Sequence, residues 1–383
     1  MALERLKLIA WVKVEILKLK GLNSMAERKK RNVEKKEERP VDFIHTGSTC
    51  LNLALSNRGK DGGWARGRID NVVGDGSSGK TLVALEACAN VFYDMLGTES
   101  HNFPKVKEVL VVYNNVEGVM DFPIDSMYGS PFNEGVEWIR TGVIQEFGWD
   151  FMKRVRALKD GQMLFYVVDS WDALDSEEEL KAFIESIEKE KPQDGSFDLG
   201  KQKYGSKRFF KTLCSEIEGD NGQVKKDCTL LIVSQTRQKI GVVFGEKKYR
   251  AGGDALNFYT HQVLWLADRG KIHHVKEGVK VVEGIEVSAG VKRNKTAKPF
   301  REASFPILFD HGIDDIMSMV QFIHGPQSKE VKDFFGSNFK TYETLANYVD
   351  KEGLKDELIK MTEEKWHRIQ GSKKHIRKRR FPE

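Results

Sequence analysis

The sequence lacks the features that mark secreted, zinc-binding and membrane-spanning proteins. Its four cysteines in 383 residues form no CxxC pair, which excludes a disulfide framework and a cysteine-based zinc site and indicates reduced thiols. Its nine histidines include no HExxH motif, and the adjacent pair His273-His274 has no ligand partner at metal spacing. No apolar stretch is long and uncharged enough to span a membrane or to serve as a secretory signal. We therefore expect a cytoplasmic protein that does not enter membranes.

The charge is distributed unevenly along a chain of ordinary globular composition, with 40% hydrophobic and 31% charged residues. Residues 1–40 carry 12 Lys/Arg against 6 Asp/Glu, and residues 371–383 carry 6 against 1, so the net charge of +5 hides an acidic middle. An acidic body with basic ends suits a nucleotide-binding core whose ends touch a polyanion. Such ends are equally typical of disordered, solubilising segments.

The pattern of residue types predicts three parts. Residues 1–40 form a basic N-terminal segment, which is either an oligomerisation helix or an upstream extension before a natural start at Met25. Residues 41–312 form the core. Residues 313–383 form a small C-terminal α-rich unit that ends in a basic tail.

Within the predicted core, apolar strands alternate with segments of helical period. The clearest strands are Val109–Tyr113, Met163–Asp169 and Leu230–Ser234, and residues 176–191 are predicted to form an exposed amphipathic helix. This alternation predicts an α/β fold with a mainly parallel central sheet flanked by helices. Because ligands gather at the carboxyl ends of such strands, we expect the chemistry there.

A glycine-rich turn lies between an apolar run and a helix-like one. It has the Walker A pattern, Gly74-Asp75-Gly76-Ser77-Ser78-Gly79-Lys80-Thr81. Such a turn points backbone N–H groups at phosphate oxygens, and the following helix adds the positive end of its dipole. Lys80 would hold the β- and γ-phosphates and Thr81 would ligate Mg²⁺. The competing interpretation is a Gly/Ser-rich turn that matches by chance.

Two acidic residues follow predicted strands. Asp169 ends an apolar run in the form of a Walker B strand, whose carboxylate completes the Mg²⁺ shell; alternatively it caps a helix. Glu117 follows the strand Val109–Tyr113, where a general base or a water-positioning group is needed, although a surface-turn glutamate has the same pattern. Asp121, four residues further on, is placed to reach the nucleotide base.

The strand Leu230–Ser234 ends at an amide, Gln235, which can hydrogen-bond a γ-phosphate and signal its presence to the loop that follows. In that loop, cations alternate with apolar side chains, a composition typical of single-strand binding surfaces and also of mobile, solvated connections. These residues are Arg237, Lys239, Ile240, Phe244, Lys247, Lys248, Tyr249 and Arg250.

Taken together, these stretches resemble the bacterial RecA recombinase family over about residues 43–313. The loop Lys239-Ile-Gly-Val-Val-Phe-Gly245 and the segment Asn294-Lys-Thr-Ala-Lys-Pro-Phe300 are more specific than the two Walker elements, which all P-loop ATPases share. The stretches that match are Ile44–Leu55, Gly67–Ile69, Gly74–Thr81, Val168–Ser170, Gln235–Gly245, Gly252–Tyr259 and Lys292–Phe300.

The resemblance implies an ATP site shared between protomers. Glu117 would activate water, Gln235 would sense the γ-phosphate and Asp121 would touch adenine. Arg293 and Lys295 would reach the neighbouring protomer's ATP, as arginine fingers do, because the family binds ATP between subunits of a helical filament.

The resemblance also implies two DNA-binding loops, near residues 200–208 and 237–253. In the second loop, Ile240 would wedge between bases, while Gly252 and Gly253 would offer backbone N–H groups to phosphate. The residues implied to contact DNA are Lys203, Tyr204, Lys207, Arg208, Arg237, Lys239, Ile240, Phe244, Arg250, Gly252 and Gly253.

The chain departs from the family pattern in several places. Asn115 stands where the family has Asp, and Tyr249-Arg250-Ala251 replaces a threonine-rich stretch. The tail is basic where bacterial members are often acidic, which predicts an extra contact with duplex DNA. These departures suit a phage or mobile-element recombinase acting in a host cytoplasm.

The sequence therefore predicts an ATP- and Mg²⁺-dependent recombinase that forms helical filaments on single-stranded DNA and exchanges strands with homologous double-stranded DNA. Two alternatives remain open. One is a ring-forming helicase or remodeller of the same fold, and the other is a DNA-coating filament protein with weakened ATPase activity.

Overall fold

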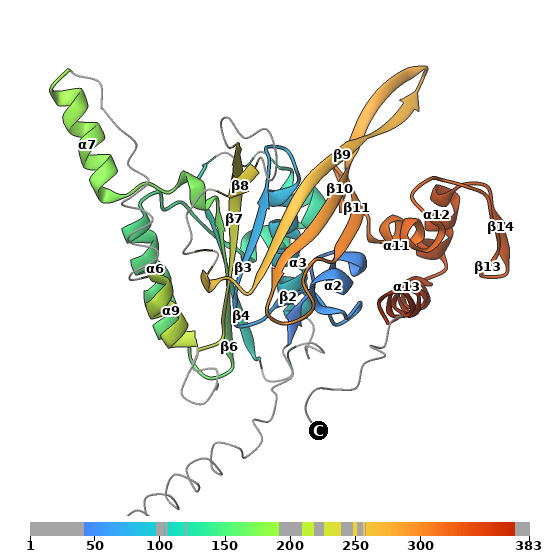
Figure 1. Ribbon diagram of the computed structural model, residues 1–383, viewed down its shortest axis with the longest axis horizontal. Coiled ribbons are helices and arrows are strands. Elements are labelled where there is room, and N and C mark those ends of the chain that lie inside the picture. The colour runs from blue at the N-terminus through green and yellow to red at the C-terminus, as the bar shows by residue number, and fades with distance from the viewer. Residues whose placement is uncertain are drawn as a thin grey trace, which may run out of the picture. The chain divides into compact units, whose positions relative to one another are not determined.

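A ten-stranded mixed sheet organises the chain in the computed structural model (Figure 1). The structure describes residues 42–96, 103, 106–118, 120, 122–190, 209–217, 226–238, 248–250, 256 and 258–371. Asp42–Glu383 is one compact unit by its internal contacts. The predicted segment 1–40, the first DNA-binding loop and the tail after residue 371 lie outside the described residues. The predicted domain boundary after residue 312 stays a prediction.

The strands of the described residues fall into the large sheet and two small ones. Those of the large sheet are β3 (Ile69–Gly74), β4 (Glu108–Asn115), β5 (Glu137–Ile139), β6 (Gln162–Asp169), β7 (Cys228–Gln238), β8 (Lys248–Arg250), β9 (Gln262–Lys276), β10 (Val279–Asn294), β11 (Glu302–Leu308) and β12 (Gly312–Ile313). The small ones pair β1 (Phe43–Ile44) with β2 (Trp64–Ala65) and β13 (Val331–Phe334) with β14 (Ser337–Phe339).

The helices of the described residues lie mostly on the two faces of the large sheet. They are α2 (Thr49–Ser56), α3 (Lys80–Leu96), α4 (Ile124–Tyr128), α5 (Ser130–Gly135), α6 (Ile144–Ala157), the 3₁₀ turn η1 (Trp171–Ala173), α7 (Glu177–Glu188), α9 (Phe210–Ile217), α11 (Asp315–His324), α12 (Tyr342–Lys351) and α13 (Lys355–Gln370).

The centre of the large sheet is parallel, as predicted. Neighbours in the order β5-β4-β6-β7-β3-β9 pair in parallel, and β10, β11 and β12 continue the sheet antiparallel. Strand β8 pairs antiparallel with β7 alone. The three predicted strands are confirmed as β4, β6 and β7. The long β9–β10 hairpin, which extends away from the helices in Figure 1, was not predicted.

Both faces of the central strands are buried, which explains their continuous apolar runs. In β6, Phe165 and Val167 face one hydrophobic cluster while Tyr166 and Val168 face the other. The first cluster packs against α2 and α3, and the second against α6 and α9 (Figure 1). Each such side chain contributes about 1.5–3 kcal/mol of burial free energy, so the sheet is fixed firmly from both sides.

The predicted helical spacing near the C-terminus is confirmed by α12 and α13. Their apolar residues Leu345, Val349 and Leu358 belong to the same cluster as α2 and α3, so these helices pack on the core rather than forming a separate hydrophobic centre. Among the described residues, no helix has both the length and the apolar character needed to cross a bilayer.

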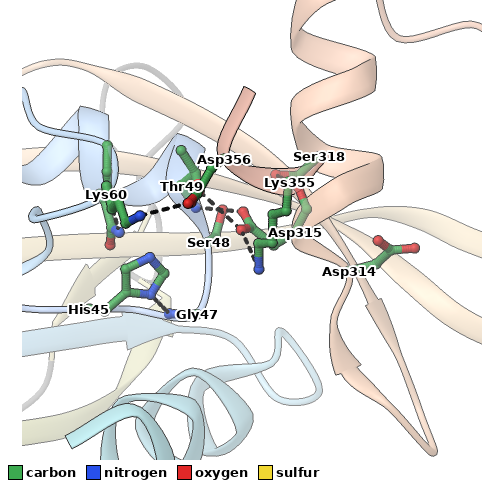
Figure 2. A network of polar contacts seen from close by, with 12 residues as sticks. His45, Gly47, Ser48, Thr49, Lys60, Asp314, Asp315, Ser318, Lys355 and Asp356 are labelled. Carbon is green, nitrogen blue, oxygen red and sulfur yellow. Dashed lines mark hydrogen bonds and ion pairs between the residues drawn. The ribbon is translucent and has the colours of Figure 1, made fainter. Parts of the chain in front are cut away.

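A polar network attaches the C-terminal helices to α2 (Figure 2). The buried carboxylate of Asp315 accepts hydrogen bonds from the Thr49 backbone N–H at 2.6 Å and from its hydroxyl at 3.0 Å. The ammonium of Lys355 lies 3.2 Å from the same carboxylate. A second, exposed pair joins Lys60 to Asp356 at 2.8 Å. The buried carboxylate therefore carries most of this attachment.

We expect Asp315→Ala to lower the free energy of unfolding by about 3 kcal/mol, because two buried donors on Thr49 lose their acceptor. Urea unfolding at neutral pH measures this change. Lys60→Met is the matched control and should cost less than about 1 kcal/mol, since its pair is solvated. Equal losses in the two variants would contradict the assignment.

Candidate nucleotide site

The register of the parallel strands brings four predicted site residues to one edge of the sheet. Asn115 at the end of β4 is paired with Asp169 at the end of β6, and Gly74 at the end of β3 is paired with Gln235 in β7. Glu117 follows β4 by two residues. The structure thus gathers the P-loop, Asp169, Glu117 and Gln235 at the carboxyl edge, where the sequence predicts a ligand site.

The predicted P-loop connects β3 to α3. Its backbone takes positive φ values at Ser77 (+59°) and Gly79 (+85°). The positive φ favours glycine at position 79, and a Cβ there would also stand 2.5 Å from the terminal methyl carbon of Ile307, which would have to shift. Lys80 is the first residue of α3, and the N-terminus of this helix is therefore directed into the loop.

The residue Lys80 is 9% exposed, and its ammonium donates to the backbone carbonyl of Asp75 at 2.6 Å. Burial lowers the pKa of Lys80, while the carboxylates of Asp169, Glu117 and Asp75 oppose that shift. A cation held inside the loop and surrounded by carboxylates matches what a phosphate cradle requires.

Asp169 is buried, and the hydroxyl of a neighbouring strand residue binds its carboxylate. The Tyr113 hydroxyl donates to Oδ2 at 2.7 Å. Burial raises the pKa of the Asp169 carboxyl, whereas hydrogen bonds from Tyr113 and Thr81 lower it. The influence of Thr81 on the pKa of Asp169 indicates that the two predicted Mg²⁺ ligands lie near one another.

Glu117 is held by two donors. The Ser170 hydroxyl donates to its Oε1 at 2.7 Å, and the Gln235 amide donates to the same oxygen at 3.0 Å. The backbone N–H of Gln235 in turn donates to Asp172 at 2.6 Å. The carboxylate is therefore oriented at the mouth of the P-loop, and its position depends on β7.

The donor set fits a nucleoside triphosphate with Mg²⁺. Lys80 supplies a cation for phosphate, and the Thr81 hydroxyl and the Asp169 carboxylate supply the hard oxygens that Mg²⁺ prefers. No group of three His, Cys, Asp or Glu side chains in the described part of the chain is arranged to hold a metal on its own. Since Mg²⁺ is usually held by one or two carboxylates together with substrate phosphates, this fits the predicted site.

Asp75 binds both strands that flank the second predicted DNA loop. Its carboxylate accepts hydrogen bonds from the Thr236 hydroxyl in β7 and from the Lys248 ammonium in β8. Sequence reasoning missed this role, and it also missed Tyr113, Ser170 and Asp172. Tyr113 and Ser170 could have been chosen from the sequence because they lie at predicted strand ends near Glu117 and Asp169. Which side chains they contact is seen only once the pairing of the strands is known.

Arg293 and Lys295 lie at the opposite end of β3 from the P-loop. Both donate to the backbone carbonyl of Phe258, at 3.4 and 3.3 Å. Asn294, which lies between these two cations, is paired with Gln262, and Gln262 is paired with Asp70 near the start of β3. Gly74, where the P-loop begins, lies four residues after Asp70, which is a separation of about 13 Å along the strand. The structure does not bring these cations to their own chain's P-loop.

The predicted DNA-binding residues are only partly described. Arg237 is exposed at the end of β7, whereas Arg250 in β8 is buried and donates to Asn71 in β3. The remaining ones lie outside the described residues, as does Asp121, so their roles stay predictions: Lys203, Tyr204, Lys207, Arg208, Lys239, Ile240, Phe244, Gly252 and Gly253.

The strand order and the elements at its carboxyl edge define the chain as a P-loop protein with an α/β core. A family model described as the RecA N-terminal domain matches residues 167–314. Protein RecA of Wolbachia sp. subsp. Brugia malayi is 30% identical over 308 residues, which is 80% of this chain and 73% of that protein. Protein RecA of Acinetobacter baylyi is 30% identical over 280 residues, 73% of this chain and 68% of that protein.

Protein RecA of Clostridioides difficile is 29% identical over 277 residues, 72% of this chain and 68% of that protein. The chain belongs to the RecA family. The region matched by the family model contains Asp169, Gln235, Arg293 and Lys295, and it begins after the P-loop and Glu117.

We expect Tyr113→Phe to lower the free energy of unfolding by about 1.5–3 kcal/mol near neutral pH, since a buried carboxylate loses a charge-assisted hydrogen bond. The loss should shrink in acid, where protonated Asp169 accepts a weaker bond. Denaturant unfolding at several pH values measures both effects. Tyr342→Phe is the control: Tyr342 is also buried, and its hydroxyl has no hydrogen-bond partner among the described residues. Equal losses in the two variants would count against the contact.

Proposed function

We propose that this chain is an ATP-dependent DNA recombinase that forms helical filaments on single-stranded DNA and catalyses homologous pairing and strand exchange. The observation that carries the proposal is the convergence of Lys80, Asp169, Glu117 and Gln235 at the carboxyl edge of the sheet in a member of the RecA family. The proposed place of action is the cytoplasm, and the proposed partners are single-stranded DNA, homologous duplex DNA and further copies of the chain.

Lys80 would bind the β- and γ-phosphates of ATP, while Thr81 and Asp169 would hold Mg²⁺. Bound Mg²⁺ would neutralise charge on the phosphate oxygens. To reach phosphate, the Lys80 ammonium must exchange its present acceptor, the carbonyl of Asp75, for a phosphate oxygen. Lys80 and Asp75 both belong to the P-loop, so this exchange would take place within the loop that binds the phosphates.

Glu117 would orient the water that attacks the γ-phosphate. Its Oε1 is occupied by Ser170 and Gln235, which leaves the other carboxylate oxygen to accept a proton from water. The Gln235 amide touches this carboxylate and also begins the segment that leads to the second DNA loop. It would therefore link hydrolysis to DNA contact.

The location of Arg293 and Lys295 supports a nucleotide shared between protomers. These cations lie at the far end of β3 from their own P-loop, so they would serve the nucleotide of a neighbouring copy and not that of their own chain. Phe258, which is 71% exposed beside them, would pack in the same interface. A contact between unlike surfaces builds a helix when its rotation does not close and a ring when it does.

We expect Lys80→Ala to abolish nucleotide-dependent binding to single-stranded DNA, because the phosphates lose their cation. Glu117→Gln should bind ATP and DNA but hydrolyse ATP at least about a hundredfold more slowly, since general-base catalysis contributes that much. Fluorescence anisotropy with a labelled oligonucleotide and a phosphate-release assay measure the two. Rapid hydrolysis by Glu117→Gln would show that the base lies elsewhere.

A strand-exchange assay with homologous and heterologous duplex tests the proposed activity itself. Exchange that requires ATP and homology supports the proposal. Electron microscopy of the chain on single-stranded DNA should show open helical filaments. Closed rings would indicate the helicase or remodeller alternative, and filaments without ATP hydrolysis would indicate a DNA-coating protein.

A further inference from the structure

Asp75 makes a contact that the proposed activity does not require of a P-loop residue. Its two carboxylate oxygens accept from different strands, Oδ1 from the Thr236 hydroxyl and Oδ2 from the Lys248 ammonium. Thr236 lies near the end of β7 and Lys248 begins β8, so one carboxylate holds both sides of the stem that leads into the second predicted DNA loop.

The stem is itself a defined structure. Residues 236–238 of β7 pair antiparallel with 248–250 of β8, with Thr236 opposite Arg250. The buried Arg250 guanidinium donates to Asn71 in β3, four residues before Asp75. The segment 71–75 therefore contacts the stem at two points, one in β3 through Asn71 and one in the P-loop through Asp75.

The stem also determines where Gln235 lies. Gln235 directly precedes Thr236, its backbone N–H is fixed by Asp172, and its side chain reaches Glu117. Holding Thr236 against the P-loop thus keeps the Gln235 amide beside the carboxylate that is proposed to orient water.

The contact is polar and solvent-accessible. The side chains of Asp75 and Lys248 are 47% and 45% exposed, so the ion pair adds at most about 1 kcal/mol to folding. Hydrogen bonds from Lys248 and Thr236 lower the pKa of Asp75, which keeps its carboxylate charged at neutral pH. An exposed pair of this kind can form and break without unfolding the protein, whereas a buried one could not.

We propose that Asp75 is a positioning residue that couples nucleotide to single-stranded DNA, by tying Thr236 and Lys248 to the P-loop and thereby holding the loop stem and Gln235 in place. This inference rests on the proposed function. The same Asp75 offers its backbone carbonyl to Lys80, so a phosphate that draws Lys80 away alters the residue that holds the stem. Nucleotide and DNA would then influence one another through this carboxylate, with equal effect in both directions.

A double-mutant cycle on Asp75 and Lys248 tests the coupling. The quantity measured is the ratio of the Kd for a labelled single-stranded oligonucleotide without nucleotide to the Kd with a non-hydrolysable ATP analogue and Mg²⁺. Asp75→Asn and Lys248→Met should each lower this ratio by up to about fivefold, which is the factor that about 1 kcal/mol of coupling supplies. The ratio of the double variant should be no lower than that of the more affected single variant, because both substitutions remove the same ion pair.

Three further variants separate positioning from a general structural effect. Asp75→Glu keeps the carboxylate, so its ratio of Kd values should be closer to that of the wild type than the ratio of Asp75→Asn is. Thr236→Val removes only one hydroxyl and should lower the ratio. Lys60→Met breaks an exposed ion pair of the same kind, with Asp356, that includes no residue of the P-loop or the stem, and it should leave the ratio unchanged. Thermal unfolding midpoints of Lys248→Met and Lys60→Met should agree closely, since both pairs are solvated.

The outcomes distinguish the two proposals. A wild-type ratio near one overturns the proposed function and this inference with it. A large wild-type ratio with independent, additive losses in the cycle, or no loss in Lys248→Met, overturns the inference alone. Should Asp75→Asn fail to fold, Lys248→Met and Thr236→Val carry the test.

Discussion

The register of the parallel strands is the constraint on which the site depends. Hydrogen bonds between β4 and β6 and between β3 and β7 fix which residues end side by side, and they bring Asn115 next to Asp169 and Gly74 next to Gln235. A slip of one residue would turn every side chain of a strand to the other face. Because both faces are packed by separate hydrophobic clusters, the slip would expose a whole apolar set, and the register is held by burial far from the chemistry.

Several candidate residues could be predicted because motifs and strand ends mark them in the sequence. Lys80 is predicted from the Walker A pattern, Asp169 and Gln235 are predicted from their positions at the ends of apolar runs, and the parallel centre of the sheet follows from the alternation of strands and helices. The supporting contacts could not be predicted in this way. Tyr113 reaches Asp169 across 56 residues of sequence, and Ser170 reaches Glu117 across 53. Such contacts depend on which strands are neighbours, and periodicity along one strand carries no information about that.

The attachment of the C-terminal helices shows the same limit. Helical spacing predicts α12 and α13, but the buried carboxylate of Asp315 meets Thr49 across 266 residues. The β9–β10 hairpin was missed because its outer half is exposed on both faces and lacks the alternation that marks a half-buried strand. Arg293 and Lys295 show a third kind of limit, since the partner proposed for them belongs to another copy of the chain.

Buried interactions and exposed interactions have different roles at the site: the first keep it in place, and the second can change. Asp169 is buried, and moving its carboxylate out of place would leave a desolvated charge without a partner, which is costly. Asp75 and Lys248 are half exposed, so water can replace each partner at little cost. A contact that responds to nucleotide binding must break and re-form at a free-energy cost similar to the coupling free energy between two ligands. That coupling free energy is typically 1–3 kcal/mol. The exposed pair lies at the lower end of that range and the buried carboxylate lies far above it, which is why the proposed coupling is assigned to Asp75 and the fixed part of the cradle to Asp169.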